Sequence, residues 1–379
     1  MIASVPTHDT VSLVIAGAEL TGWISYDVTV SMLDPADAFR LQLPFSREAW
    51  ELTLPDRPCQ VFIDGTPVLT GFIDSASMPE DAEVIDIAGR CRVGRLADHC
   101  PSTLAFDGLG IAELAAKIVN PFFARVTLSN ARNRAIVRGK GKKARAAAEP
   151  VRLNTKVGTT IEPGQTAWAT LEKLLDQAGY LAWSSGDGRE LVIGKPNYEQ
   201  EVQFYFFRPL PGGPRAAEAT VLAMGIGRDH ADAYARVVIA GTGVGTNVSY
   251  GAPVAGRLGE ARNNPARADG TGIDFTVPKT LITQRAAASI AEADELAALE
   301  MARRDAKKRP VTVRCAGHGQ VIAGSYTTLF AHDLLALVED EYTGTKGIYT
   351  ITSCNYRSAR AGAEETVMQL VPKGTELSR

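Results

Sequence analysis

The first ninety residues alternate apolar and polar side chains with a period near two, and this alternation constrains the fold more than any other feature of the chain. The alternating segments are VSLVI (11–15), GWISYDVTVSM (22–32), FRLQLPF (39–45), CQVFI (59–63), VLTGFIDSAS (68–77) and EVIDIAGRC (83–91). They are rich in β-branched and aromatic residues, as is typical of strands. The Asp64-Gly65 pair predicts a tight hairpin, because glycine readily adopts the positive φ of primed turns. The pattern therefore predicts a meander of antiparallel strands.

A short stretch of this region is nearly repeated, as LTGWI at 20–24 and LTGFI at 69–73. Glycine inside a strand often marks a bulge or a bend. Two copies do not make a solenoid or a propeller, which needs at least three units to bury a continuous core. We therefore predict that Gly22 and Gly71 both lie in bent strands at a barrel corner, where a valine would destabilise the fold similarly at either position. A ligand-binding loop is the alternative.

The pattern changes after Cys100, where GIAELAAKIVNPF (110–122) has the apolar spacing of a helix. A second helix is predicted after residue 165, with Thr166 as its N-cap and Gly179 as its C-terminal stop. A hairpin, YLAWS then ELVIG, is expected to follow and to turn at 186–188. The proline- and glycine-rich stretch 209–214 then predicts a boundary. This middle part is therefore predicted to be α+β.

The last third returns to strand patterns. Strands are predicted at 219–227 and 235–243, an extended excursion at 246–283, a helix at 289–310 and further strands at 311–372. At 379 residues the chain is long enough for more than one domain, because single cores rarely grow far beyond about 250 residues. The order of elements is therefore β, then α+β, then β again.

Composition excludes several classes of protein. Forty basic and 43 acidic residues give a net charge of −3, too small for a long-range field that would attract nucleic acid or an anionic membrane. The five cysteines form no C-x-x-C pair, so neither a disulfide framework nor a zinc site is indicated. We find no signal peptide and no apolar run long enough to span a membrane, and we expect synthesis in the reducing cytoplasm, with no membrane partner.

Several motifs suggest chemistry without supporting it. GTGVGT (241–246) has the wrong glycine spacing for a dinucleotide loop, and no phosphate-binding or nucleophile-elbow motif is present. Asp98, His99 and Cys100 are adjacent in sequence, so the chain cannot aim them at one another as a triad. Arg228-Asp229-His230 is more typical of a turn between strands. We therefore predict no catalytic, cofactor-binding or metal-binding residues, and no cofactor.

A basic stretch, 132–152, contains five closely spaced cations and could contact phosphates: Arg138, Lys140, Lys142, Lys143 and Arg145. It has no interleaved aromatic residues for base stacking, so an exposed loop or a salt-bridge contact with another chain is favoured over nucleic-acid binding. An enzymatic alternative is a glycoside hydrolase using carboxylates such as Glu339, Asp340 and Glu341, but sequence alone does not place any pair across a bond.

The order of elements resembles the baseplate hub proteins of Mu-like contractile-tailed phages and the wider late control protein D group. The resemblance lies in VSLVIAGAELTGWISYDVTVSM, CQVFIDGTPVLTGFIDS, IEPGQTAWATLEKLLDQAGYLAW and GIYTITSCNYRS…ETVMQLVPKG. It implies a β-rich α+β fold with two tube-protein-like β-barrel domains per chain and inserted α+β segments. It also implies a homotrimeric ring with pseudo-sixfold symmetry, which joins the hexameric tail tube to the trimeric central spike.

The same resemblance implies a domain order. The first barrel would span 1–100, an α+β domain 101–212, and a discontinuous second barrel 213–245 plus 310–379, with an insertion of extended segment and helix at 246–309. The implied partners are tail tube or distal tail proteins, the spike and neighbouring baseplate proteins, and DNA could pass through the ring without specific binding. The protein would be a non-enzymatic virion component made in the bacterial host cytoplasm. The alternatives are a tail-associated peptidoglycan hydrolase and the hub of a type VI secretion-like spike, although such spikes continue into a long β-helix.

Overall fold

The computed structural model describes residues 10–80, 83–101, 105–109, 111–120, 122–123, 125–129, 157–161, 163–241, 257–263, 275–285, 290–306, 309–322, 326–358, 363–375 and 377. The chain divides into two compact units. The first unit consists of Met1–Gly225, Thr312–Lys373 and Ser378–Arg379, and the second of Ile226–Val311 and Gly374–Leu377. No helix within the described ranges is long and apolar enough to cross a membrane.

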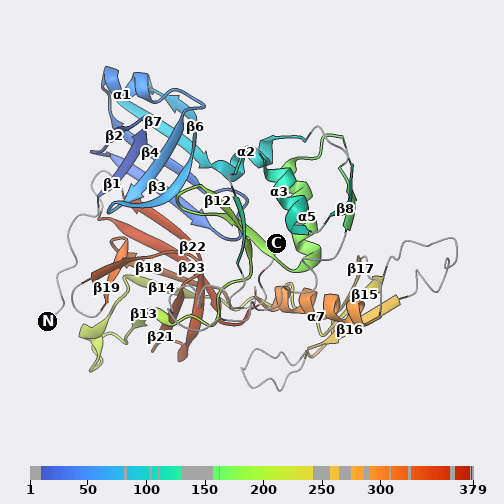
Figure 1. The fold of residues 1–379 in the computed structure, drawn as a ribbon. Coiled ribbons are helices and arrows are strands. Elements are labelled where there is room, and N and C mark those ends of the chain that lie inside the picture. Colours follow the sequence, from blue (N-terminus) through green and yellow to red (C-terminus); the bar gives the residue numbers. More distant parts are fainter. Residues whose placement is uncertain are drawn as a thin grey trace, which may run out of the picture. The chain divides into compact units, whose positions relative to one another are not determined.

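The N-terminal strands form an antiparallel array at one end of the first unit (Figure 1). They are β1 (Val11–Ile15), β2 (Ala18–Leu20), β3 (Ser25–Ser31), β4 (Ala38–Pro44), β5 (Pro58–Ile63), β6 (Thr66–Ser77) and β7 (Val84–Cys91). Burial alternates along β7, residue by residue, because successive side chains point to opposite faces. Asp64 and Gly65, between β5 and β6, both have positive φ, 49° and 72°. The predicted antiparallel strands and the hairpin are confirmed, but the strands do not form one meander, because the order β3-β4-β7-β6-β5-β1-β2 places β4 beside β7 and β1 beside β5.

The C-terminal strands continue the same hydrogen-bonded sheet. They are β13 (Val202–Arg208), β14 (Ala223–Ile226), β18 (Val311–Ala316), β21 (Leu335–Asp340), β22 (Thr345–Ser358) and β23 (Glu365–Pro372). The order β14-β18-β23-β22 leads directly into β3, and β13 joins through β21, so that thirteen strands form one sheet. A separate hairpin, β19 (Gly319–Ile322) with β20 (Tyr326–Leu329), follows β18. The predicted β-rich α+β fold is confirmed, and the strands of the two predicted barrels form two halves of one continuous ladder.

The α+β segment of the first unit contains the two predicted helices and the predicted hairpin, together with a helix and three strands that were not predicted. Its elements are α2 (Arg92–Asp98), β8 (Ala105–Leu109), α3 (Ile111–Val119), β9 (Arg125–Ser129), β10 (Val157–Thr160), α5 (Ala167–Ala178), β11 (Leu181–Ser184) and β12 (Glu190–Gly194). The hydroxyl of Thr166 accepts a hydrogen bond from the backbone N–H of Ala169, and Gly179 ends α5 in the left-handed region. The predicted cap, stop and hairpin are therefore confirmed. The parallel pairing of β9 with β12 is not evident from the sequence.

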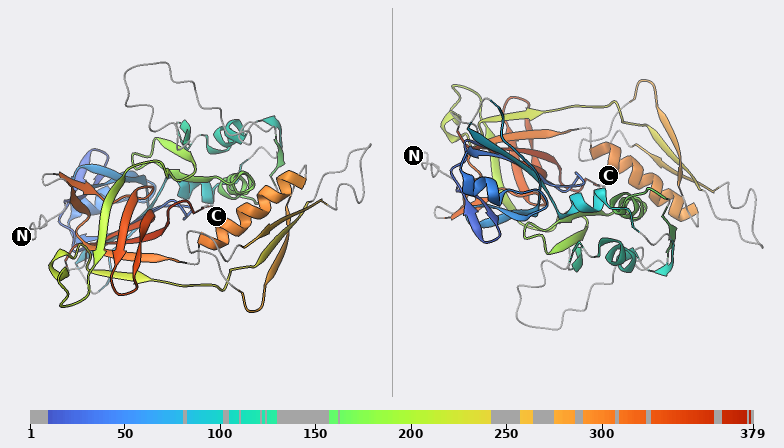
Figure 2. Two further views of the ribbon diagram at one scale, coloured as in Figure 1. Left: turned by 90° about the horizontal axis from the view of Figure 1, so that it is seen from below. Right: turned by 90° about the horizontal axis from the view of Figure 1, so that it is seen from above.

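The second unit is a three-stranded sheet with one helix on one face (Figure 2). Its elements are β15 (Arg236–Gly241), β16 (Arg257–Arg262), β17 (Thr280–Arg285) and α7 (Ile290–Ala306). Val237 and Ile239 of β15 pack against Ala293 and Ala297 of α7. Gly259 lets the helix approach closely, because a Cβ there would lie 2.0 Å from the carbonyl carbon of Ala293.

This unit corrects two predicted boundaries. Residues 236–241 belong with the insertion and not with the second barrel, because the alternate apolar residues of β15 are buried under α7. The predicted extended excursion contributes strands β16 and β17, which each pair with β15. Residues 246–256 and 264–274 of the excursion lie outside the described residues. Residues 202–208 were placed in the predicted α+β domain without a strand, but they form β13, which pairs with β21 of the C-terminal sheet.

The two copies of the near repeat also differ. Leu20 ends β2 and residues 21–24 connect it to β3, so Gly22 lies in a loop, with φ +78° and open space around it. LTGFI lies inside β6, where a Cβ on Gly71 would lie 1.9 Å from the carbonyl oxygen of Arg90 in β7. The prediction of a strand position at both glycines is therefore wrong for Gly22 and confirmed for Gly71, where the neighbouring strand leaves no room for a side chain. The short helix α1 (Arg47–Leu52) was not predicted.

Candidate functional site: joints within the first unit

The ladder between β3 and β22 joins the two halves of the large sheet. The strands are antiparallel, and six residue pairs are in register from Ser31↔Ser353 to Tyr26↔Ser358. Asn355 strengthens this joint, because its side-chain amide donates to the carboxylate of Asp27 at 2.6 Å and to the hydroxyl of Thr29 at 2.7 Å. Strands more than 300 residues apart in the sequence are therefore locked in one register.

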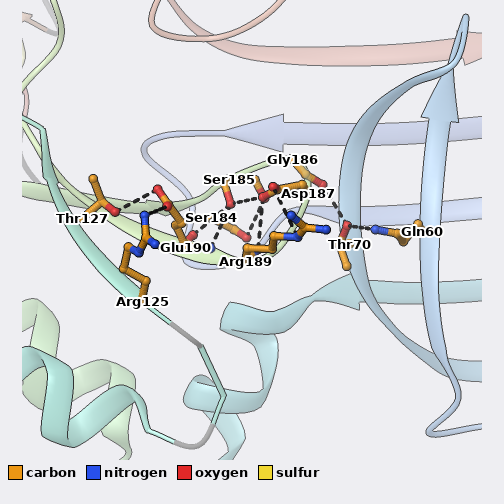
Figure 3. Close-up of polar contacts among 10 residues, drawn as sticks. All are labelled: Gln60, Thr70, Arg125, Thr127, Ser184, Ser185, Gly186, Asp187, Arg189 and Glu190. Carbon is orange, nitrogen blue, oxygen red and sulfur yellow. Dashed lines mark hydrogen bonds and ion pairs between the residues drawn. The ribbon is translucent and has the colours of Figure 1, made fainter. Parts of the chain in front are cut away.

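A second joint holds the β11–β12 hairpin against the first strands, and Figure 3 shows its polar contacts. Thr70 of β6 donates its hydroxyl hydrogen to the carbonyl oxygen of Gly186 at 2.9 Å. Gln60 of β5 donates its amide hydrogen to the same Thr70 oxygen at 3.1 Å. The tip of the hairpin is thus hydrogen-bonded to β6 through Thr70, and Gln60 of β5 holds the same Thr70 hydroxyl.

This joint depends on two glycines of the hairpin turn. A Cβ on Gly186 would lie 2.4 Å from the carbonyl oxygen of Pro67, and one on Gly188 would lie 2.5 Å from Cβ of Thr70. Gly188 also has a positive φ of 65°, which side chains rarely adopt. The sequence predicted the turn at 186–188, but a turn alone does not require glycine at position 186. The close contact of Gly186 with Pro67 of β6 explains this glycine, because a side chain would collide there.

The hairpin is itself cross-linked by polar side chains. Ser185 donates its hydroxyl hydrogen to Asp187 at 2.6 Å, and this bond, more than any other contact, lowers the pKa of the Asp187 carboxyl. At the other side, Glu190 accepts hydrogen bonds from Arg125 at 3.0 Å and Thr127 at 2.8 Å, as Figure 3 shows. These contacts hold the hairpin in one conformation, so its packing against β6 costs little conformational entropy.

The carboxylates considered for a hydrolase are bound by cations and hydroxyls. Glu339 accepts from Arg215 at 2.7 Å, from Tyr205 at 2.9 Å and lies 3.2 Å from the Lys346 ammonium. These contacts, with Arg215 the strongest, lower the pKa of Glu339 to about 2. A glycosidase acid needs a raised pKa so that it keeps its proton near neutrality, so Glu339 has the opposite property.

Asp340 and Glu341 are held in the same way. Arg208 binds the buried Asp340 through two nitrogens, at 2.6 and 2.9 Å. Burial opposes ionisation of Asp340, but the hydrogen bonds from Arg208 and Thr343 outweigh it and lower the pKa of the carboxyl. Glu341 accepts from the backbone N–H of Leu210 at 2.8 Å. The geometry indicates that this cluster fastens β13 and β21 together.

The two histidine motifs are also structural. Asp98 pairs with Arg90 at 2.7 Å, while His99 ends α2 and packs its ring against Phe122 with the centroids 5.1 Å apart. Cys100 is exposed, and its sulfur lies 3.7 Å from the carbonyl oxygen of Gly164. These three neighbours therefore contact three different partners and not one another. This agrees with the expectation that residues adjacent in sequence cannot be aimed at one another as a triad.

In the second motif, Asp229 accepts a hydrogen bond from the backbone N–H of Ala231 at 2.8 Å, which closes the predicted turn. Most of GTGVGT (241–246) and the basic stretch 132–152 lie outside the described residues. Across the parts of the chain that the structure describes, we find no group of three or more histidine, cysteine, aspartate or glutamate side chains arranged to hold a metal ion.

Residues 10–92 match the family model of the Mu phage baseplate assembly protein GpP-like, N-terminal. The match covers β1 to β7 and so confirms the resemblance to Mu-like baseplate proteins for this part of the chain. No curated protein matches the chain.

Solved structures of tail proteins share the fold along nearly the whole chain. A tail protein from Neisseria meningitidis is 20% identical, with a TM-score of 0.71, and the match covers 97% of each chain. The 43 kDa tail protein of prophage MuSo2 from Shewanella oneidensis is 18% identical, with a TM-score of 0.69, covering 97% of this chain and 99% of that one. A component of the type VI secretion system of E. coli is 10% identical, with a TM-score of 0.51, covering 97% and 78%. The chain therefore has the fold of phage tail proteins.

Proposed function

We propose that this protein is the structural baseplate hub of a phage or phage-like contractile tail. The observation that carries the proposal is the match of residues 10–92 to a Mu phage baseplate assembly domain, inside a fold shared with tail proteins over 97% of the chain. The polar contacts also suit a scaffold, because the carboxylates bound by arginine hold β13 against β21 and the β11–β12 hairpin is hydrogen-bonded to β6. In this role the protein acts by assembly and has no enzymatic activity.

The hub is a homotrimeric ring that joins the hexameric tail tube, or a distal tail protein, to the trimeric central spike. A trimer can present a sixfold face only if each chain supplies two equivalent surfaces. The two halves of the large sheet, β1–β7 and the strands β13, β14, β18 and β21–β23, are the candidates for these surfaces. Neighbouring baseplate proteins surround the ring in the virion, and DNA passes through its central channel without sequence-specific binding. The chain is made in the bacterial host cytoplasm.

Light scattering on the purified protein tests the ring. Three chains of 40.4 kDa give 3 × 40.4 ≈ 121 kDa, and negative-stain images should show particles with a central opening and threefold symmetry. The measurement is repeated with the partner spike present, since assembly could require it. A mass of one chain at micromolar concentrations under both conditions would contradict the proposal.

A second candidate role is the hub of a type VI secretion-like spike. It is favoured by the shared fold with the E. coli secretion component and with a Francisella PdpA-VgrG complex, which matches 98% of this chain at a TM-score of 0.53. The two roles differ in the tube that the ring binds. Binding of the ring to the tail tube protein of a contractile phage, and not to a secretion tube protein, supports the phage role, and the reverse supports the secretion role.

A further inference from the structure

A buried histidine lies at the joint between the two halves of the large sheet. His318, in the turn between β18 and β19, has no exposed surface. Its Nε2 lies 2.7 Å from the hydroxyl of Tyr26 in β3, and its Nδ1 lies 2.9 Å from the hydroxyl of Thr366 in β23. One ring therefore connects the N-terminal strands to the C-terminal strands, across 292 residues of sequence between Tyr26 and His318.

The hydrogen bonds determine which ring nitrogen carries the proton. Thr366 donates its only hydroxyl hydrogen to the carbonyl oxygen of Gly317 at 2.8 Å, so it can only accept from His318. Nδ1 must then carry the hydrogen, and in the neutral ring Nε2 is an acceptor. Tyr26 therefore donates its hydroxyl hydrogen to Nε2. The chain of bonds Tyr26 to His318 to Thr366 to Gly317 runs in one direction and requires the neutral ring.

The surroundings of the ring disfavour a positive charge. The rings of Tyr26 and Tyr356 meet it edge-on, at 5.6 and 5.4 Å between centroids. Burial lowers the pKa of His318 to about 4, and it outweighs the carboxylate of Asp64 in the β5–β6 turn and a hydrogen bond with the Gly317 backbone, which both favour protonation. Tyr356, itself buried, stays un-ionised because burial raises its pKa.

We propose that His318 is an acid-sensitive clasp, whose neutral ring holds β3 against the C-terminal strands and whose protonation weakens the joint between the two halves of the sheet. A proton on Nε2 would put a second N–H against the Tyr26 hydroxyl, whose hydrogen would have to turn away. It would also place a charge in a site with no exposed surface, which is costly unless the charge is paired. The clasp is independent of the proposed role in a tail.

The pH range follows from the direction of the shift. A histidine whose pKa falls from 6.5 to about 4 on folding contributes its full stabilisation above pH 6.5 and loses it as the pH falls toward 4. The difference of about 2.5 pH units corresponds to a loss of roughly 300-fold in the folding equilibrium constant. This loss adds to whatever the carboxylates contribute in the same range.

The test compares the full-length wild type with His318→Gln, whose amide can still donate to Thr366 and accept from Tyr26 but does not titrate. Urea unfolding is measured from pH 7.5 to pH 4.5, with His99→Gln as the control for a histidine outside the joint. We expect wild type and His99→Gln to lose at least 30-fold more in the folding equilibrium than His318→Gln over this range. Equal losses in all three proteins would overturn the proposal.

A second measurement uses the unmodified protein, in case His318→Gln does not fold. Nitrogen-15 histidine NMR should show His318 as the Nδ1-protonated tautomer at pH 7 and still neutral at pH 5. Hydrogen exchange corrected for its intrinsic rate should show protection falling at the β3–β22 ladder before the β5–β6 ladder as pH is lowered. An Nε2-protonated ring at pH 7, or titration above pH 6, would overturn the proposal.

Discussion

The close approach at Gly71 allows one substitution to be worked through in numbers. A Cβ added at Gly71 would lie 1.9 Å from the carbonyl oxygen of Arg90 and 2.7 Å from Cα of Cys91, whereas ordinary contact begins at 3.4 Å. Both obstacles are backbone, so no rotamer change relieves them, and β6 and β7 must separate by up to 3.4 − 1.9 = 1.5 Å. A ladder hydrogen bond of about 2.9 Å would then stretch to about 4.4 Å, which is too long to count as a bond.

We therefore expect Gly71→Ala to cost about 2–4 kcal/mol, from two lost ladder bonds and the strain of overpacking. Gly22→Ala should cost only about 1–2 kcal/mol, because Gly22 has a left-handed φ but open space around it. The matched control is Gly347→Ala, in strand β22, where the nearest atom is a Tyr349 ring carbon at 3.5 Å. It should change stability by less than about 0.5 kcal/mol.

Urea unfolding followed by tryptophan fluorescence, together with thermal melting followed by circular dichroism, measures all three variants beside wild type. The expected order of midpoints is wild type and Gly347→Ala highest, then Gly22→Ala, then Gly71→Ala. If Gly71→Ala unfolded together with Gly347→Ala, the contact between β6 and β7 would not be the reason for glycine at this position. A loss of one binding event with an unchanged midpoint would instead support the ligand-loop alternative.

Three further predictions concern the two polar joints and the hydrolase alternative. Thr70→Val, which keeps the shape but removes the donor to Gly186, should cost about 1 kcal/mol in thermal unfolding and speed proteolysis of the hairpin turn; unchanged cleavage there would count against docking. Arg208→Met leaves the buried Asp340 unpaired and should cost about 3–5 kcal/mol, with partial recovery when Asp340→Asn is added, whereas no recovery would place the loss elsewhere. The pure protein should not clear a peptidoglycan suspension, and clearing that Glu339→Gln abolishes would show that the hydrolase alternative is correct.

The elements of the chain could be predicted where their signals are local. Thr166 and Gly179 bound α5 because a capping hydroxyl and a left-handed glycine act within one helical turn. The Asp64-Gly65 hairpin could be predicted because its signal is also local: two adjacent turn residues adopt the positive φ that the turn requires. Strand β13 was missed because VQFYFFR has no clear alternation, since the adjacent Phe206 and Phe207 are both buried. Its partner β21 also lies far along the chain, with Asp340 132 residues after Arg208.

The sequence by itself determined the β, α+β, β order of the segments, the hairpin turns and the resemblance to Mu-like baseplate proteins, because these depend on neighbouring residues and on a shared linear pattern. Only the tertiary structure decided which glycines meet another backbone, which carboxylates meet arginine, and that β3 pairs with β22. It also placed His318 between Tyr26 and Thr366. These facts depend on residues distant in sequence whose pairing no local period encodes, since a strand's alternation specifies which face is buried and not which strand lies beside it.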